Sequence, residues 1–234
     1  MVETISAVLR VMPRGGGFPS LVETISGRRF IVKLSGVGQG VSGLLTEFVA
    51  TRLAAALGLK VPRVLPLMLS KALPWQTGTD EFYDALQRSS GWNLGVEFVD
   101  DAQDVAANGL GDIPADFLDR LSSVDSLLQN VDRTLQNPNL LRDRKGEYWA
   151  IDFGACLFLD RFARFGSRMT FELPTNHFAA GRRVATLTLE NAHVPLREVV
   201  SDIPDSWADS VPGGRQALLE ALSKLIDVYI YRKG

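Results

Sequence analysis

Two short stretches of the sequence decide its fold: Asp132-Arg133-Thr134-Leu135-Gln136-Asn137 and Ile151-Asp152-Phe153-Gly154. In the first, an aspartate stands five positions before an asparagine, and in the second an aspartate precedes Phe-Gly. This order is typical of a phosphoryl-transfer site of the kinase type. At such a site, the first aspartate orients the accepting hydroxyl, while the asparagine and the second aspartate hold a metal ion on the nucleotide phosphates.

The residues between the two motifs predict a β-hairpin. Residues 140–142 and 148–152 read as strands, with a turn at 143–146. Such a hairpin would bring Asn137 and Asp152 to the same end, which is the geometry that a shared metal ion requires. Both side chains offer oxygen ligands, which Mg²⁺ prefers. We therefore predict that Asp132 is the catalytic residue and that Asn137 and Asp152 are magnesium ligands.

Further elements are predicted from periodicity and from turn residues. A helix runs from an N-cap at Asp112 to about Gln129, and an amphipathic helix covers about 214–232. The first half of the chain predicts strands and one helix that ends at Gly58. Their ranges are strands at 4–12, 20–26, 29–34, 61–69 and 92–100, a helix at 43–57, and a less clear segment at 74–91 that could hold a short helix.

The first half also carries residues suited to holding nucleotide phosphates. Lys33 lies on the third strand and is the only lysine among the first 59 residues, so it is our candidate for neutralising the α- and β-phosphates. Glu47, on the next helix, is the only acid between Lys33 and Asp80, and it would pin that lysine. A glycine-rich turn between the first two strands would let backbone N–H groups approach the phosphates; its members are Gly15, Gly16 and Gly17.

The adenine base would sit against the connection between the two halves of the chain. Backbone groups around Glu97, Phe98 and Val99 are the candidates for its hydrogen bonds. Taken singly, each feature has a plainer explanation: the glycines form a hairpin turn, Lys33 is a solvated strand residue and Glu47 is a surface charge. It is their order along the chain that favours one shared site.

Composition is that of an ordinary globular protein and excludes several classes. The chain has 234 residues, 46% hydrophobic and 22% charged, with a net charge of −2, so no nucleic-acid partner is expected. No apolar run is long enough to predict a membrane span, and the first residues do not read as a signal peptide. The single cysteine, Cys156, allows no internal disulfide. We expect a reduced cytoplasmic protein.

The motifs resemble those of the HipA-like kinases and, more distantly, of the phosphoinositide kinases. The similarity lies in the Asp-Arg-x-x-x-Asn loop at 132–137, in Ile-Asp-Phe-Gly at 151–154, and in the segment 46–62, where a glutamate-bearing helix ends in Gly-Leu before Val-Pro. The resemblance implies a two-lobed α+β kinase-like domain. Its N-lobe, an antiparallel sheet plus the Glu47 helix, would span 1–100, and its mainly helical C-lobe would span 101–234.

The resemblance also implies that the protein binds ATP and Mg and transfers the γ-phosphate to a hydroxyl. The acceptor could be a protein Ser/Thr or a small molecule. One alternative is a pseudokinase, which would bind nucleotide or act as a scaffold without turnover. Another is a globular binding domain that takes no nucleotide, in which every motif is accidental.

The remaining polar and reactive residues have plainer expectations. Cys156 should be a small buried residue rather than a reactive thiol. His177 and His193 should be surface or capping residues, since Asp132 already fills the role of base. A group of arginines follows the second motif and forms either a solvated face or a patch for an acidic or phosphorylated substrate: Arg161, Arg164, Arg168, Arg182 and Arg183.

Overall fold

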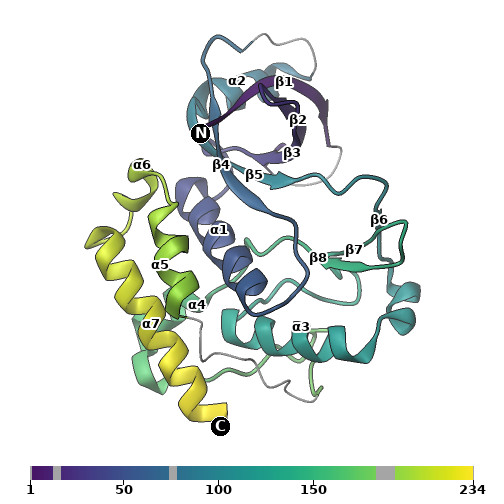
Figure 1. The fold of residues 1–234 in the computed structure, drawn as a ribbon, viewed down its shortest axis with the longest axis vertical. Helices are drawn as coiled ribbons and strands as arrows, with labels where there is room; N and C mark the ends of the chain where they lie inside the picture. The colour runs from purple at the N-terminus through teal and green to yellow at the C-terminus, as the bar shows by residue number, and fades with distance from the viewer. Residues whose placement is uncertain (1, 13–16, 74–77, 183–192, 234) are drawn as a thin grey trace.

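The computed structural model describes residues 2–12, 17–73, 78–182 and 193–233 and has a mixed fold of strands and helices (Figure 1). A five-stranded barrel lies at one end of the molecule, and most of the helices lie at the other. The barrel strands are β1 (Glu3–Val11), β2 (Ser20–Thr24), β3 (Arg29–Lys33), β4 (Val64–Leu69) and β5 (Gly91–Glu97). A small second sheet contains β6 (Gln103–Asp104), β7 (Leu140–Arg142) and β8 (Tyr148–Ala150).

Seven α-helices and two short 3₁₀ turns complete the described fold. They are α1 (Gly40–Ala56), α2 (Asp80–Arg88), η1 (Ala107–Asp112), α3 (Ala115–Leu128), α4 (Phe158–Phe165), η2 (Gly166–Arg168), α5 (His193–Ser201), α6 (Asp205–Ala208) and α7 (Gly214–Lys233). Among the described residues, no helix is both long and apolar enough to cross a membrane.

The barrel closes in the order β1-β2-β3-β5-β4, which differs from the antiparallel sheet predicted from the sequence. Four of its pairings are antiparallel, but β1 and β4 run parallel, with Glu3 opposite Leu67 and Thr4 opposite Met68. A parallel pair needs a long crossover connection, and the chain between these two strands contains α1. The closure pairs the strand edges that an open sheet would expose.

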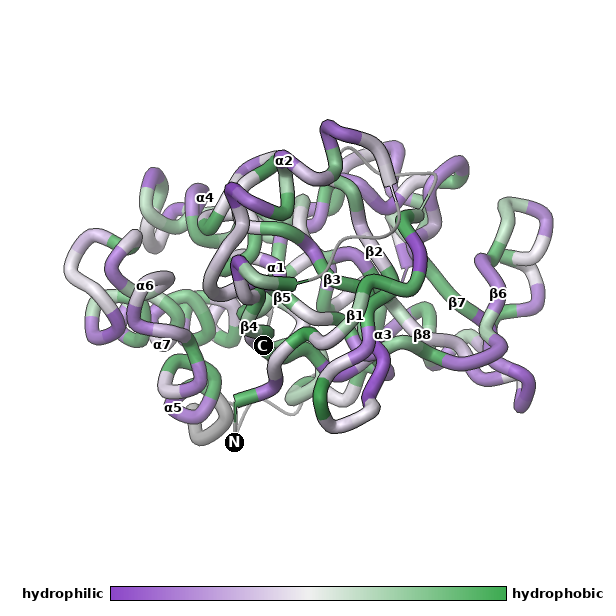
Figure 2. Tube along the Cα trace, turned by 90° about the horizontal axis from the view of Figure 1, so that it is seen from above, coloured by the Kyte–Doolittle hydropathy of each residue, from purple (hydrophilic) through white to green (hydrophobic). Residues whose placement is uncertain are grey.

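The barrel has its own hydrophobic core. Its strands contribute fully buried side chains such as Val22, Phe30 and Leu67, and Phe82 of α2 packs onto the same cluster. Gly95 of β5 lies against Leu67, so a Cβ atom there would stand 2.4 Å from Leu67 Cδ1. Figure 2 shows hydrophobic stretches in the strands near the middle of the view and hydrophilic ones along the outer loops.

A second, larger core joins α1 to the helices that follow the barrel in sequence. Helix α1 buries residues around its whole circumference, including Leu45, Phe48 and Leu53, as expected for a helix packed on more than one side. Phe48 meets Trp207 of α6 edge to face, with 6.1 Å between ring centroids. The helix that carries Glu47 is therefore held by the α5–α7 region as well as by the barrel.

The sequence predicted the end of α1 correctly and the start of α3 incorrectly. At the end of α1, Gly58 has φ +78°, and its N–H donates to Ala55 O while Leu59 N–H donates to Ala54 O. This Schellman arrangement confirms the predicted stop at Gly58. The predicted N-cap at Asp112 is wrong, because Asp112 ends η1 and α3 begins only after Pro114, which cannot continue the preceding turn.

Substitution of Phe48 by alanine should lower the free energy of unfolding by about 3–5 kcal/mol, since it empties a fully buried aromatic site in the larger core. Ile25→Ala is the matched control, because Ile25 is 76% exposed and the change should stay within about 0.5 kcal/mol. Urea unfolding measures both. Equal losses for the two variants would contradict the described packing of α1.

Candidate active site

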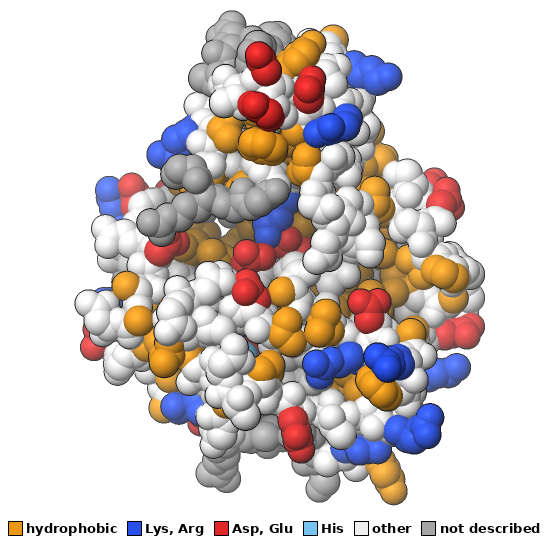
Figure 3. Space-filling view, turned by 180° about the vertical axis from the view of Figure 1, so that it is seen from behind, with side chains coloured by type: hydrophobic (Ala, Val, Ile, Leu, Met, Phe, Trp, Pro, Cys, Tyr) orange, Lys and Arg blue, Asp and Glu red, His pale blue; other side chains and the backbone are white. Residues whose placement is uncertain are grey.

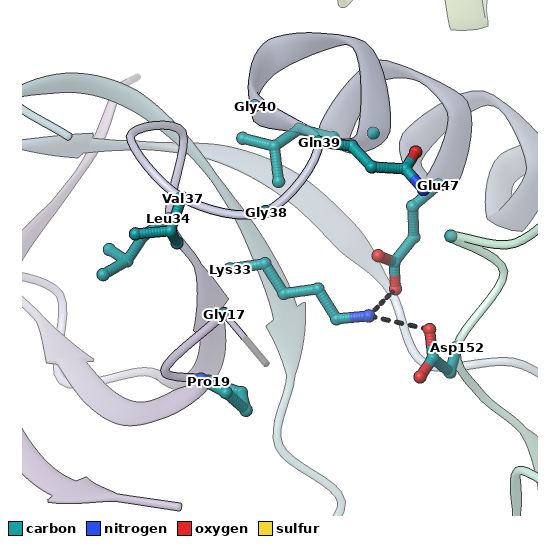
Figure 4. A pocket seen from close by; sticks show the side chains of 13 residues that line it. Gly17, Pro19, Lys33, Leu34, Val37, Gly38, Gln39, Gly40, Glu47 and Asp152 are labelled. Atoms are coloured by element: carbon teal, nitrogen blue, oxygen red, sulfur yellow. Dashed lines mark hydrogen bonds and ion pairs between the residues drawn. The ribbon is translucent and has the colours of Figure 1, made fainter. Parts of the chain in front are cut away.

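Lys33 lies at the centre of a charged cluster that joins three separate segments of the chain (Figure 4). It is the last residue of β3, and its Nζ donates to Glu47 Oε1 at 2.6 Å and to Asp152 Oδ1 at 3.0 Å. Glu47 comes from α1, and Asp152 follows β8. The structure therefore brings together the strand lysine, the helix glutamate and the aspartate of the Asp-Phe-Gly motif, as the sequence predicted.

Burial and charge shift the three groups in different directions. Burial alone would lower the pKa of Lys33, but the two carboxylates outweigh it, so the pKa is raised and the ammonium stays charged at neutral pH. Burial raises the pKa of Glu47, although Lys33 acts against it. For Asp152, burial would also raise the pKa, but the charge and hydrogen bond of Lys33 lower it overall. Asp152 is thus held as an anion beside a cation.

The backbone around Asp152 is adapted to this contact. Asp152 has φ +58°, a left-handed conformation that a non-glycine residue adopts at a cost. Two residues later, a Cβ atom on Gly154 would lie 3.3 Å from Glu47 Oε2 and 3.6 Å from Asp152 Oδ1. Because Gly154 has no side chain, the carboxylates of Glu47 and Asp152 can occupy this space.

A cavity of about 270 Å³ opens beside this cluster, and glycines line much of it. Its wall includes Lys33, Glu47 and Asp152 together with Gly17 from the loop before β2. Of the predicted glycine turn, Gly15 and Gly16 lie outside the described residues. The wall also contains residues that our sequence analysis did not assign to a site: Val37, Gly38 and Gln39 before α1, and Gly40 and Gly43 at the start of that helix. The glycines that recur across the start of α1 were the signal that could have found them.

Asp132 is held by two amide side chains on the loop that follows it. Its Oδ2 accepts hydrogen bonds from Asn137 Nδ2 at 2.8 Å and from Asn139 Nδ2 at 3.3 Å. Asp132 Oδ1 has no hydrogen-bond partner among the residues that the structure describes. Asn139 was not singled out from the sequence, and its φ of +50° marks it as a strained position in the loop.

The predicted hairpin forms between this loop and Asp152. Leu140 pairs with Ala150 and Arg142 with Tyr148, and beyond the strands Ile151 N–H donates to Asn139 O at 3.0 Å. The loop that carries Asp132 and Asn137 therefore leaves the hairpin at the same end as Asp152.

Arg133, next to Asp132, is fully buried and joins several backbone segments. Its Nε donates to Asp125 Oδ2 at 2.7 Å, and its Nη1 donates to the carbonyl oxygens of Pro138 and Asn139 at 2.9 and 2.7 Å. Its Nη2 reaches Ile151 O at 3.4 Å. One guanidinium thus ties the end of α3 to both sides of the hairpin.

His177 belongs to the same buried network, so the expectation of a surface or capping residue is wrong for it. Its Nε2 lies 3.0 Å from Asp125 Oδ2, and its Nδ1 accepts a hydrogen bond from Ala179 N–H. That acceptor role assigns the proton to Nε2, which then donates to Asp125. Asp125 also accepts from Asn130 Nδ2 at 3.2 Å, so this buried carboxylate has three side-chain donors. The side chain of His193 is not among those described.

Residues 97–99 connect the barrel to the rest of the chain. The N–H groups of Glu97 and Phe98 already donate to Arg63 O at 2.8 Å and Arg29 O at 3.0 Å. The Val99 N–H has no acceptor within the described ranges, which leaves it as the free backbone donor of this connection.

Two other expectations concern the segment after Asp152. Cys156 is buried and free, as predicted, and burial raises the pKa of its thiol well above the usual range. In the arginine group, Arg182 pairs with Asp119 at 2.8 Å, and Arg183 lies outside the described residues. The other members are treated below.

Comparison with known proteins agrees with this geometry. The family model of the HipA-like kinases matches residues 5–228. The chain belongs to the HipA-like kinase family. Among solved structures, it is similar to the crystal structure of a Helicobacter pylori proinflammatory kinase, CtkA, with a TM-score of 0.54 and 14% identity over 100% of this chain and 98% of that one. No curated protein matches the chain. The likeness to the solved kinase shows the fold, and the family match supports a phosphotransferase.

Asp125→Asn should lower the free energy of unfolding of this HipA-like kinase by about 3–5 kcal/mol, because it leaves the Arg133 charge buried without its carboxylate. Asp119→Asn makes the same chemical change in the partly exposed pair with Arg182 and should cost at most about 1 kcal/mol. Urea unfolding at neutral pH compares them. A loss at Asp125 no larger than at Asp119 would show that Arg133 does not depend on this carboxylate.

Proposed function

We propose that this HipA-like kinase binds ATP with Mg²⁺ and transfers the γ-phosphate to a hydroxyl acceptor. The observation that carries the proposal is the position of Lys33 Nζ, within 3.0 Å of both Glu47 Oε1 and Asp152 Oδ1. A kinase site needs a cation for the phosphates, a carboxylate that orients it and an acidic metal ligand nearby. Here these three come from distant parts of the sequence and meet at one point.

In the proposed complex, Lys33 neutralises the α- and β-phosphates while Glu47 holds it in place. Backbone N–H groups of the glycine segment 15–17 approach the phosphates, and Gly38 and the first helical residue of α1, Gly40, line the same cavity. The adenine lies against residues 97–99, where the Val99 N–H is available to it. The nucleotide then sits between an N-lobe of residues 1–100 and a C-lobe of residues 101–234.

The donor set beside Lys33 fits a magnesium ion. Asp152 is an anion with 45% of its side chain exposed, and Asn137 uses its Nδ2 for Asp132, which leaves its Oδ1 for a metal. No group of three or more His, Cys, Asp or Glu among the described residues could hold a metal by itself. Mg²⁺ commonly takes only one or two protein carboxylates and completes its shell with phosphates and water. When bound, it would neutralise charge on the phosphates.

The chain's own residues supply the remaining steps. Asp132 accepts the proton of the acceptor hydroxyl through Oδ1, the oxygen that neither Asn137 nor Asn139 occupies. The hydroxyl oxygen forms a bond to the γ-phosphorus as the bond to the bridging oxygen of ADP breaks. Lys33 stabilises the charge that remains on the leaving diphosphate. The buried Arg133 network holds Asp132 in register with the hairpin throughout.

Mg-ATP at millimolar concentration should raise the Tm of the wild-type protein, because a ligand that binds only the folded state stabilises it. Lys33→Met should abolish that rise, and Asp152→Asn should remove its dependence on Mg²⁺. Lys60→Met is the matched control, since Lys60 pairs with Glu147 and stacks on Trp149 away from the cavity. A wild-type protein that shows no rise in Tm would rule out the proposed nucleotide site.

Asp132→Ala should keep the Mg-ATP-induced rise in Tm and lower the rate of phosphate transfer by about 10²-fold or more, because it removes the proton acceptor but no phosphate ligand. Transfer to the protein itself and to peptide and small-molecule hydroxyls is followed with labelled ATP. Asp104→Ala, an exposed aspartate on β6, is the control for loss of an acidic side chain. ATP binding without transfer in the wild type, unchanged in Asp132→Ala, would identify a pseudokinase instead.

A further inference from the structure

One face of the protein gathers arginines that form no ion pair with any residue that the structure describes. Arg161 and Arg164 lie on α4, Arg168 in η2 and Arg232 near the end of α7, and these three elements pack together. None of the four forms an ion pair within the described ranges. Arg161 donates to the neutral Gln129 Oε1 and Arg232 to Ser167 O, while Arg164 and Arg168 have no side-chain hydrogen bond to any described residue.

Other described arginines also form no ion pair with described residues, namely Arg10, Arg63, Arg88, Arg120, Arg142 and Arg197, so what distinguishes the four is that they gather on elements that pack together. Seven others pair with aspartate or glutamate in the described part of the structure: Arg28, Arg29, Arg52, Arg133, Arg144, Arg182 and Arg215. The net charge of the chain is −2, so the four charges are a local excess and not part of a generally basic surface. Figure 3 shows basic side chains gathered at the lower right of this face, with hydrophobic ones among them.

The arginine face begins at the loop that carries Asp132. Leu157 N–H donates to Gln129 O at 3.1 Å, and the Arg161 guanidinium donates to the side chain of the same glutamine. Gln129 ends α3 in a left-handed conformation, three residues before Asp132. A molecule bound along α4 would therefore lie next to the proposed catalytic loop.

The face has both a hollow and exposed apolar side chains. The hollow has a volume of about 490 Å³ and is lined by Arg161, Arg164, Phe165 and Met169, with one acid, Asp160. Phe165 is 42% exposed, and Tyr231 on the adjoining α7 is 89% exposed. Arginine and aromatic side chains are the residues most enriched where proteins bind other proteins.

We propose that this α4–α7 arginine face binds an acidic, Asp/Glu-rich segment of a protein acceptor and presents a nearby hydroxyl to Asp132. The inference rests on the proposed kinase function, and it narrows the acceptor to a protein. Carboxylates match arginine guanidinium groups in geometry and charge, and the apolar side chains of the same segment would contact Phe165 and Tyr231. A nucleic acid is disfavoured by the acidic net charge and by Asp160, and a membrane by the short length of α4.

Fluorescence anisotropy tests the face directly, without any phosphate transfer. The probe is a labelled peptide in which Asp and Glu alternate with Leu and Ser, and a second peptide replaces every acid by its amide. The acidic peptide should bind, and Arg164→Glu with Arg168→Glu should weaken it by about tenfold or more. Arg10→Glu with Arg197→Glu changes the net charge equally at exposed sites elsewhere and should change the affinity less than about twofold.

Several results would overturn the proposal. They are equal affinity for the amide peptide, equal weakening by the two double variants, or binding of anionic vesicles with none of the acidic peptide. A phosphorylated peptide that binds while the acidic one does not would also replace the proposed occupant. If the protein phosphorylates the acidic peptide, the Arg164 and Arg168 double variant should raise its KM and leave kcat unchanged. Peptide binding by a protein that transfers phosphate to no acceptor would keep the arginine face and reject the kinase, so the two proposals fail separately.

Discussion

The buried ion pair between Arg133 and Asp125 is the interaction on which the rest of the site depends. Both side chains are fully shielded from solvent, so each charge would be very costly without the other. Replacing such a pair with apolar residues is often neutral for stability, so its value lies in what the guanidinium fixes. Its remaining donors hold the carbonyl groups of Pro138, Asn139 and Ile151. The loop of Asp132 and the strand before Asp152 therefore share one rigid anchor.

The Lys33 cluster depends on a second constraint, the packing of α1. Glu47 can meet Lys33 only if α1 is held at a fixed distance from β3, and α1 is clamped between the barrel strands and helices α5 and α6. Because Glu47 is buried, its charge requires the ammonium beside it. Asp152 draws on the same ammonium from the opposite side of the site. The cation thus connects the part of the molecule anchored by α1 with the part anchored by Arg133.

Local patterns in the sequence were enough for the hairpin, for α1 with its stop at Gly58, and for the pairing of Lys33 with Glu47. The hairpin and α1 have signals in neighbouring residues, whereas Lys33 is the only lysine among the first 59 residues and Glu47 the only acid between Lys33 and Asp80. Barrel closure was not predictable in this way, because the parallel pairing of β1 with β4 is set by contacts between residues over sixty positions apart. Asp125 and His177 were missed for a related reason. An isolated polar residue is expected to be exposed until its buried partners are known, and here Asp125 meets Asn130 and Arg133 from the loop after α3 and His177 from a distant segment.

The segment that follows Asp152 contains an exposed portion and a buried portion with different physical roles. The portion around His177 is buried. There His177 stacks on Phe178 and donates a hydrogen bond to the carboxylate of Asp125, which also pairs with Arg133. The α4 portion faces outward and carries arginines that form no ion pair with described residues, yet Arg161 still reaches Gln129, three residues before Asp132. Buried hydrogen bonds between ionised groups resist salt, whereas exposed charges are screened within about 10 Å at moderate ionic strength. Added salt should therefore weaken binding to the exposed arginines of α4 while leaving the position of Asp132 unchanged. Substrate binding and phosphate transfer would then depend on salt in different ways.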